Sequence, residues 1–326
     1  MDKILLEVEN LKTYFSLKRG LLKAVNGVSF TVNEGQSVGL VGESGCGKTI
    51  TTMSILRLIP KPAGKIVGGR ILFKGEDLVQ KSEKEMGKKR GSEISLIMQD
   101  PMTSLNPVFT IGDQIRDVIR LHGGVKDKRL INRMAIEALE QVNISGAETR
   151  ISDYPHQMSG GMRQRVVGAI AICCSPSLLI ADEPTTSLDV TTQAQYLRLL
   201  RGIQQEKKLS MLFITHDLGI VAKMCDAVCV MYLGKVVERA SVRELWNNPR
   251  HPYTIALMKA MPKMGSMVER LYSIKGMVPS LLNLPSGCMF RPRCEMVGDY
   301  CRNEDPPEID LGGGHYVRCW REKGQI

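Results

Sequence analysis

One glycine-rich segment, Gly42-Glu43-Ser44-Gly45-Cys46-Gly47-Lys48-Thr49, constrains the fold more than any other feature of the sequence. It follows a short apolar run at 36–41 and precedes 49–59, where apolar residues have helical spacing. Glycines let the backbone turn its N–H groups inward, and the helix that follows adds its positive end, so the segment suits phosphate oxygens. The pattern therefore predicts a strand, a phosphate loop and a helix, with Lys48 reaching the outer phosphates and Thr49 binding Mg²⁺.

A second apolar run, 178–181, ends in two carboxylates, Asp182 and Glu183. Ligands of open α/β sheets bind at the carboxyl ends of the strands, so we expect both acids beside the phosphates. Asp182 is predicted to belong to the Mg²⁺ shell. Glu183 is predicted to orient and polarise the attacking water, which is worth roughly 10²–10⁴ in rate. The alternative interpretation is a strand that simply ends in a polar turn.

Two further polar segments lie downstream of the phosphate loop. Ser159, Gly160, Gly161 and Met162 open a helix whose N-terminus is a second anion site. One phosphate group does not need two such sites from one subunit, so we expect this turn to grip ATP held by a partner; the alternative is an ordinary helix cap by Ser159. His216 follows a third strand, 211–214, and is predicted to contact the γ-phosphate, although a single histidine is more often structural.

The pattern of the remaining chain bounds the fold and the compartment. Strand-like and helical stretches alternate over the first 250 residues, which implies a largely parallel sheet covered by helices. The 326 residues correspond to roughly two folded units. No apolar run approaches the ~18 residues of a membrane-spanning helix, and residues 1–7 lack the basic start of a secretion signal. We expect a cytoplasmic protein, unless a partner holds it at a membrane.

Taken in order, these segments resemble the ATPase subunit of an ABC transporter over about residues 4–250. The resemblance adds Gln99 as the Q-loop residue and Ser187, Leu188 and Asp189 as the D-loop. It implies an α/β fold of the P-loop NTPase class, of ABC type, with a RecA-like core, an antiparallel β subdomain and a helical subdomain. The implied ATPase domain covers residues 1–255, with the helical subdomain at about 100–172.

The resemblance also implies a role for each motif. ATP on the phosphate loop of one subunit would be closed over by Ser159, Gly160, Gly161 and Met162 of the other, in a nucleotide-sandwich dimer. Gln99 would bind Mg²⁺ with Thr49 and Asp182, and would sense the membrane partner. The implied catalytic residues are Lys48, Asp182, Glu183 and His216. The implied ATP-binding residues are Tyr14 or Phe15 against adenine, Gly42, Glu43, Ser44, Gly45, Cys46, Gly47, Lys48, Thr49, Thr51 and Gln99.

Residues 158–162 correspond to the signature motif of this family, and we call them the signature turn. They depart from the usual Leu-Ser-Gly-Gly-Gln, because Met158 and Met162 flank the Ser-Gly-Gly core. Methionine in place of glutamine removes a polar side chain at the dimer seam. This change weakens the case for a homodimer and makes a heterodimer with a paralogous ATPase attractive.

The C-terminal part narrows the family further. Segments 248–254 and 285–294 resemble the C-terminal extension of dipeptide and oligopeptide importer ATPases, whose close relatives include nickel-importer ATPases. The resemblance implies an extension at 256–326 and an energy-coupling ATPase of a peptide importer, or alternatively of a nickel importer. It implies a second ABC ATPase subunit (a paralogue or a copy), two transmembrane permease subunits and, indirectly, a substrate-binding protein. The chain would then lie peripherally on the cytoplasmic face of the membrane.

Four cysteines cluster in this extension: Cys288, Cys294, Cys301 and Cys319. A chain without a secretion signal is not expected to form disulfides. Four thiolates can hold a [4Fe–4S] cluster or zinc, but structural zinc sites favour closely spaced cysteine pairs, which are missing here. The segment has few apolar residues for a core of its own, so a cross-link would substitute for one. We predict a structural or regulatory [4Fe–4S] cluster, with zinc, free thiols and disulfides as the alternatives.

The net charge of +10 leaves a different class of function open, an ABC-type ATPase that acts on nucleic acid or ribosomes. Genome-maintenance members of that class insert coiled coils between the phosphate loop and the signature, whereas 42–159 has no sustained heptads. Translation-factor members carry two cassettes, whereas this chain has one. A binding module without turnover conflicts with the presence of Lys48, Glu183 and His216. We therefore favour the importer ATPase and expect no nucleic-acid partner.

Overall fold

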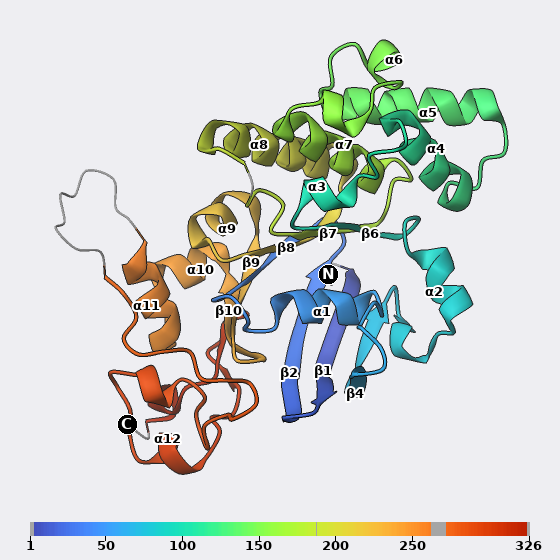
Figure 1. Cartoon of the computed structure of the whole chain (residues 1–326). Helices are drawn as coiled ribbons and strands as arrows, with labels where there is room; N and C mark the ends of the chain where they lie inside the picture. The colour runs from blue at the N-terminus through green and yellow to red at the C-terminus, as the bar shows by residue number, and fades with distance from the viewer. Residues whose placement is uncertain (1–2, 187, 262–271, 325–326) are drawn as a thin grey trace. The chain divides into compact units, whose positions relative to one another are not determined.

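The computed structural model describes residues 3–186, 188–261 and 272–324, and it contains two compact units (Figure 1). Each unit is assembled from three separate stretches of the chain. The first comprises Met1–Leu5, Val32–Gln36 and Gln80–Phe213. The second comprises Leu6–Thr31, Ser37–Val79 and Ile214–Ile326. We call residues 288–319, which contain the four clustered cysteines, the cysteine-rich segment. It belongs to the same unit as the phosphate loop, although some 240 residues of sequence separate the two.

The strands of the first unit are β6 (Ile94–Ile97), β7 (Leu178–Asp182) and β8 (Ser210–Thr215), which leads into the second unit. β7 lies between β8 and β6 and runs parallel to β6, with Ile97 opposite Ala181. Every residue of β7 and β8 is buried. Continuous burial is typical of parallel strands that are covered on both faces, which agrees with the apolar runs that predicted these strands.

Helices make up most of the rest of the first unit, and α4 to α8 gather together in Figure 1. They are α2 (Glu83–Lys89), α3 (Pro101–Ser104), α4 (Ile111–His122), α5 (Lys128–Gln141), α6 (Ala147–Arg150), α7 (Gly160–Ile172) and α8 (Val190–Lys207), with a 3₁₀ turn at Pro155–Gln157. Apolar residues keep helical spacing throughout 111–142, so the sequence predicts helix over this whole range, whereas the structure forms two helices there. Gly123 follows the end of α4, and the carboxylate of Asp127 starts α5 by accepting a hydrogen bond from the N–H of Arg129 at 2.9 Å.

The second unit contains an antiparallel sheet with the strand order β2-β1-β4-β5. Its strands are β1 (Ile4–Leu17), β2 (Gly20–Asn33), β4 (Gly64–Phe73) and β5 (Glu76–Asp77), and the chain also forms α1 (Lys48–Ile55) and a 3₁₀ turn at Leu78–Gln80. Apolar and polar residues alternate only over 5–10 and 28–32, so the sequence pattern predicts only a part of β1 and of β2. Both strands continue beyond these alternating stretches, because pairing with neighbouring strands satisfies their backbone groups.

A second sheet of this unit has the order β11-β12-β10-β9-β3. Its strands are β3 (Ser37–Val41), β9 (Ala227–Tyr232), β10 (Lys235–Ser241), β11 (Ile309–Asp310) and β12 (Tyr316–Val317). β3 is parallel to β9, whereas β10, β12 and β11 are added antiparallel. The cysteine-rich segment thus supplies the last two strands, so it is part of the fold of this unit.

The helices of the second unit are short. They are α9 (Leu218–Met224), α10 (Val242–Asn247), α11 (Pro252–Ala260) and α12 (Tyr300–Asn303), with 3₁₀ turns at Arg291–Arg293 and Trp320–Lys323. Across the ranges that the structure describes, no helix combines the length and the apolar character needed to cross a bilayer.

Candidate functional site

The phosphate loop follows β3 directly, and α1 begins at Lys48. Gly47 has a φ of +105°, which is outside the range favourable to other residues, and a β-carbon there would lie 2.3 Å from the carbonyl oxygen of Ala24. A β-carbon on Gly42 would lie 2.2 Å from the carbonyl oxygen of Met231. The loop needs glycine at both positions because other backbone segments of the same unit approach it closely.

Lys48 is nearly buried, with 5% of its surface exposed. Its Nζ donates hydrogen bonds to the carbonyl oxygens of Gly42 at 2.7 Å and Glu43 at 3.1 Å. The ammonium group is therefore held inside the curve of the loop, where the sequence predicted a phosphate-binding cation. Thr49 is exposed.

The residues around Lys48 support the loop. Thr51 is buried, and its hydroxyl donates to the carbonyl oxygen of Gly47 at 2.9 Å. Cys46 is also buried, which raises the pKa of its thiol, although the charge of Lys48 opposes the increase. This thiol is therefore a small neutral filler of the loop. Ser44 and Gly45 are exposed.

Tyr14 and Phe15, the two candidates for stacking on adenine, are neighbours on β1 and so point to opposite faces. The hydroxyl of Tyr14 donates to Oδ1 of Asn26 at 2.7 Å. The ring of Phe15 lies against Gly64, where a β-carbon would come within 2.6 Å of it. Only one of the two can face a base.

His216 follows the end of β8 and is exposed. The next residue, Asp217, begins α9 and accepts hydrogen bonds from the N–H groups of Gly219 at 2.7 Å and Ile220 at 3.3 Å. The structure therefore fixes the backbone on the C-terminal side of His216 and leaves its ring accessible.

In the first unit, Asp182 ends β7 and is buried, and Glu183 follows with a φ of +45°. A non-glycine residue in this strained region is often found at a functional site. The Glu183 carboxylate accepts hydrogen bonds from Nε2 of Gln99 at 3.1 Å and from the hydroxyl of Thr186 at 3.2 Å. Gln99 and Glu183 meet because the parallel register pairs Ile97 with Ala181, and each of the two residues stands two positions beyond its member of that pair.

The signature turn begins α7, with Ser159 as its N-cap and Met158 buried before it. Oγ of Ser159 accepts a hydrogen bond from the N–H of Met162 at 3.3 Å, so the serine does cap the helix. A β-carbon on Gly160 would meet no atom of the described residues within 4 Å, whereas one on Gly161 would lie 2.6 Å from Cγ2 of Thr192. The turn lines a cavity of about 410 Å³ together with Asp189.

Asp189 is the N-cap of α8 and accepts hydrogen bonds from the N–H groups of Thr191 and Thr192, both at 3.0 Å, and from the Thr192 hydroxyl at 2.7 Å. The hydrogen bonds from Thr192 hold the pKa of this carboxyl below its usual value. Ser187, the first residue of the predicted D-loop, lies outside the described residues.

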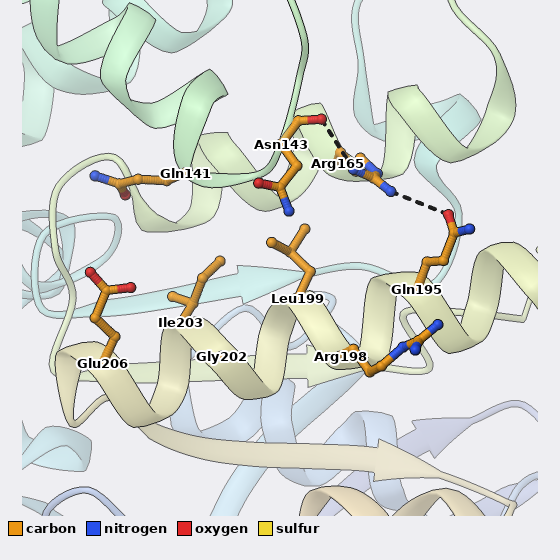
Figure 2. Close-up of a pocket in the computed structure, with 9 residues that line it drawn as sticks. All are labelled: Gln141, Asn143, Arg165, Gln195, Arg198, Leu199, Gly202, Ile203 and Glu206. Carbon is orange, nitrogen blue, oxygen red and sulfur yellow. Dashed lines mark hydrogen bonds between the residues drawn. The ribbon is translucent and has the colours of Figure 1, made fainter.

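Sequence reasoning missed Arg165, which ties the signature helix to its neighbours. Its guanidinium donates to the carbonyl oxygen of Asn143 at 3.1 Å and to Oε1 of Gln195 at 3.4 Å. Figure 2 shows this arginine at one end of a cavity of about 500 Å³, with Arg198 and Glu206 on the α8 side. Its position in the sequence could have indicated it, because Arg165 stands about one helical turn after the signature turn.

The four clustered cysteines are all thiols. Burial raises the pKa of Cys288 to about 12 and that of Cys319 to about 11, and the pKa of Cys288 is raised further by the charges of the other three. Yet within the described ranges no three or more histidine, cysteine, aspartate or glutamate side chains are placed to hold a metal ion. The predicted [4Fe–4S] cluster and the zinc alternative are therefore not supported, because the four thiols lie in one region without converging on a common centre.

Two known families match parts of this chain. A family described as ABC transporter matches residues 25–186, a range that includes the phosphate loop, the signature turn and Glu183. A family described as the C-terminal region of oligopeptide/dipeptide transporters matches residues 237–301.

Curated relatives match almost the whole chain. A probable peptide ABC transporter ATP-binding protein of Sinorhizobium fredii is 48% identical, with 98% of this chain and 95% of the relative covered. The oligopeptide transport ATP-binding protein AppD of Bacillus subtilis is 49% identical, with coverage of 97% and 96%. The dipeptide transport ATP-binding protein DppD of Escherichia coli is 45% identical, also over 97% and 96%. The chain belongs to the ATP-binding proteins of ABC transporters.

Solved structures show the same fold for this ABC ATPase. The dimeric ATP-binding cassette MJ0796, in a post-hydrolysis state with ADP and Pi, has a TM-score of 0.65 at 23% identity and covers 73% of this chain and 99% of its own. The cbiO1 protein of Clostridium perfringens has a TM-score of 0.64 at 24% identity, with coverage of 76% and 92%. The fold prediction is confirmed. The ABC ATPase binds and hydrolyses ATP and acts as the energy-coupling subunit of a transporter.

Proposed function

We propose that this ABC ATPase drives the import of dipeptides or oligopeptides through separate membrane subunits. The match of the C-terminal region at 237–301 carries the proposal, because it is joined in one chain to the ATPase motifs. The names of the relatives, which refer to peptide, oligopeptide and dipeptide transport, support the same substrate class.

We propose the following roles for the site residues of the second unit. Lys48 leaves the carbonyl oxygens of Gly42 and Glu43 to pair with the outer phosphates of ATP, and its position inside the loop supports this role. Thr49 contributes its exposed hydroxyl to Mg²⁺. His216 contacts the γ-phosphate with its exposed ring.

The first unit is proposed to supply the acids and the sensor. Asp182 and Gln99 are further oxygen ligands for Mg²⁺, which prefers such donors and neutralises phosphate charge. Glu183 accepts a hydrogen bond from the attacking water and polarises it, and its contact with Gln99 supports a link between nucleotide and membrane partner. Its strained backbone is consistent with a catalytic position.

The signature turn is proposed to close over ATP bound to a second subunit, either a copy or a paralogue. The openness of Gly160 and the adjoining cavity support such a contact from outside the chain. Met162 in place of the family's glutamine favours a paralogue as the partner. Two permease subunits would hold this dimer peripherally on the cytoplasmic face of the membrane, with a substrate-binding protein engaged indirectly.

We propose the ATPase domain at 1–255, its helical subdomain at about 100–172, and the extension at 256–326. The run of helices α3 to α7 supports the helical subdomain.

The substrate is tested by purifying the tagged chain from its own membranes and reconstituting the complex in vesicles. We expect two integral membrane proteins and a second ATPase to co-purify, and ATP to drive uptake of a labelled dipeptide or pentapeptide. The same complex carrying Glu183→Gln is the control for coupled uptake. Uptake of ⁶³Ni²⁺ alone would identify a nickel importer, and hydrolysis stimulated by nucleic acid would contradict transport.

A further inference from the structure

A two-pronged ion pair joins the phosphate loop to the cysteine-rich segment within the second unit. Nη1 of Arg293 lies 2.6 Å from Oε2 of Glu43, and Nη2 lies 3.0 Å from Oε1. Glu43 is the second residue of the phosphate loop, and Arg293 immediately precedes Cys294. The Arg293 side chain is only 4% exposed and that of Glu43 28%. A parallel fork of this kind fixes orientation as well as distance.

Arg293 is held from its other side, so the fork cannot swing freely. Its Nε donates to the carbonyl oxygen of Lys275 at 3.2 Å, and its guanidinium carbon lies 6.0 Å from the ring centre of Tyr232. The hydrogen bonds with Glu43 raise the pKa of Arg293 above its usual value. A guanidinium bonded on three nitrogens transmits a displacement of its own segment to Glu43.

An aromatic cluster anchors this segment beside the loop. The ring of Phe290, which precedes the 3₁₀ turn of Arg293, lies 5.3 Å from the rings of Tyr232 and Tyr253 and 5.8 Å from that of His251. All four aromatic side chains are buried. We call these four residues together with Arg293 the C-terminal anchor.

The anchor reaches the loop a second time through Tyr253, whose hydroxyl oxygen accepts a hydrogen bond from the N–H of Glu43 at 2.9 Å. The carbonyl oxygen of Glu43 in turn accepts from Nζ of Lys48 at 3.1 Å and from the N–H of Cys46 at 3.3 Å. Every polar group of Glu43 is thus engaged. A shift of the anchor therefore moves the residue that helps to position Lys48.

We propose that Arg293 is a positioning residue of the phosphate loop, through which the cysteine-rich segment sets the nucleotide affinity of this ATPase. The proposal rests on the nucleotide site proposed at 42–49. Coupling of this kind is reciprocal, so nucleotide on the loop must also change the stability of the cysteine-rich segment. A purely structural strap would not respond to nucleotide.

Nucleotide affinity of the full-length protein is the first measurement, with ATP and ADP as probes. We expect Arg293→Ala to weaken ATP binding about tenfold or more and to raise KM for ATP with little change in kcat. Arg293→Lys keeps the positive charge but loses the two-pronged contact, so its ATP affinity should lie between that of the wild type and that of Arg293→Ala. Combined with Glu43→Gln, Arg293→Ala should add less than the sum of the single effects, because the two residues act through one contact.

Arg291→Ala is the matched control. Arg291 lies in the same 3₁₀ turn, carries the same charge and donates to the carbonyl oxygen of Arg302 at 2.7 Å. Its loss should leave ATP affinity unchanged. Equal weakening by Arg291→Ala and Arg293→Ala would mean that general loosening of the segment, rather than the contact with Glu43, is responsible, and would overturn the proposal.

Hydrogen exchange of the segment 286–303, with and without ADP, tests reciprocity. We expect ADP to slow exchange in the wild type and in Arg291→Ala, but not in Arg293→Ala. If Arg293→Ala does not fold, Arg293→Lys and Glu43→Gln replace it with the same expectation. Exchange that ignores ADP in the wild type overturns the proposal.

Lys48→Ala separates the failure of this inference from failure of the nucleotide site. Loss of ATP binding in Lys48→Ala, with normal binding in Arg293→Ala, would leave the site standing and refute the role of Arg293. Normal ATP binding in Lys48→Ala would refute the site itself, and the inference with it.

Discussion

The phosphate loop and the signature turn are both glycine-rich entries to a helix, yet their surroundings are opposite. β-carbons on Gly42 and Gly47 would lie 2.2 and 2.3 Å from carbonyl oxygens of the same unit. A β-carbon on Gly160 would meet no described atom within 4 Å. The loop surrounds a buried lysine, whereas Ser159 and Gly160 are exposed.

The difference separates two reasons for a glycine. At Gly42 and Gly47 the chain's own backbone requires glycine, and a side chain there would disturb the fold of the phosphate loop. At Gly160 nothing in the described chain requires it, so we attribute the small residue to an approach from outside, the ATP of a partner subunit. A substitution of these loop glycines should therefore disturb the folded structure of the subunit itself, whereas a substitution at Gly160 should have an effect only when two subunits assemble.

The largest effect is expected from Glu183→Gln, which should stop turnover while both glycine segments keep their contacts. General-base help is worth roughly 10²–10⁴ in rate, so phosphate release at saturating ATP should fall by that factor. ATP affinity should stay unchanged, and bound ATP should hold two subunits together on size exclusion when the correct partner is present. Phosphate release at the wild-type rate would contradict the role of Glu183.

Gly47→Ala tests the loop side of the comparison. Strain at a φ of +105°, together with the close carbonyl oxygen of Ala24, should cost about 1–3 kcal/mol. We expect ATP affinity to fall about 5- to 150-fold and the melting temperature to decrease. Calorimetric titration and thermal unfolding measure the two effects, and unchanged values for both would mean that the loop tolerates a side chain.

Gly160→Ala tests the turn side. The β-carbon has room within the chain, and alanine favours helix over glycine by up to about 1 kcal/mol, so the melting temperature should not fall. If the turn grips phosphate, loss of one charged hydrogen bond should lower kcat about tenfold, without changing the ATP affinity of the isolated subunit. Full activity in the assembled complex would show that the turn is only a capped helix.

The smallest effect is expected on the pH dependence of stability, through His251 of the C-terminal anchor. Burial lowers the pKa of His251 from 6.5 to about 3, so the ring is neutral in the folded protein. In the unfolded chain His251 takes up a proton below pH 6.5, whereas in the folded protein it stays neutral. The free energy of unfolding therefore keeps its full value above pH 6.5 and decreases progressively as the pH falls toward 3. Nδ1 of His251 also accepts a hydrogen bond from the N–H of Tyr253 at 3.0 Å, a helix cap that asparagine can replace.

We therefore expect the difference in melting temperature between the wild type and His251→Asn to shrink as the pH falls from 8 to 5. Thermal unfolding at matched ionic strength measures it. Parallel curves across that range would show that His251 does not contribute to the pH dependence.

Local patterns were enough to predict most of the elements that carry the motifs. The end of β7 was predictable because a buried parallel strand is a continuous apolar run, and this run leads directly to Asp182, the last residue of the strand, and to Glu183 after it. Periodicity does not reveal the break between the helices at 123–127, because α4 and α5 keep similar apolar spacing on both sides of it. The predicted metal site of the four clustered cysteines failed for a different reason. Their spacing along the chain indicated a metal site, but whether the thiols converge depends on the directions in which the folded chain points them.

The sequence alone determined the phosphate loop, the acidic strand end and the signature turn, because each depends on steric and hydrogen-bonding properties of adjacent residues. It could not determine that Gly160 lies open while Gly47 is enclosed, since both read as glycine before a helix. Nor could it pair Glu43 with Arg293, which stand 250 positions apart. Such contacts depend on which distant segments the fold brings together, and only the tertiary structure decides that.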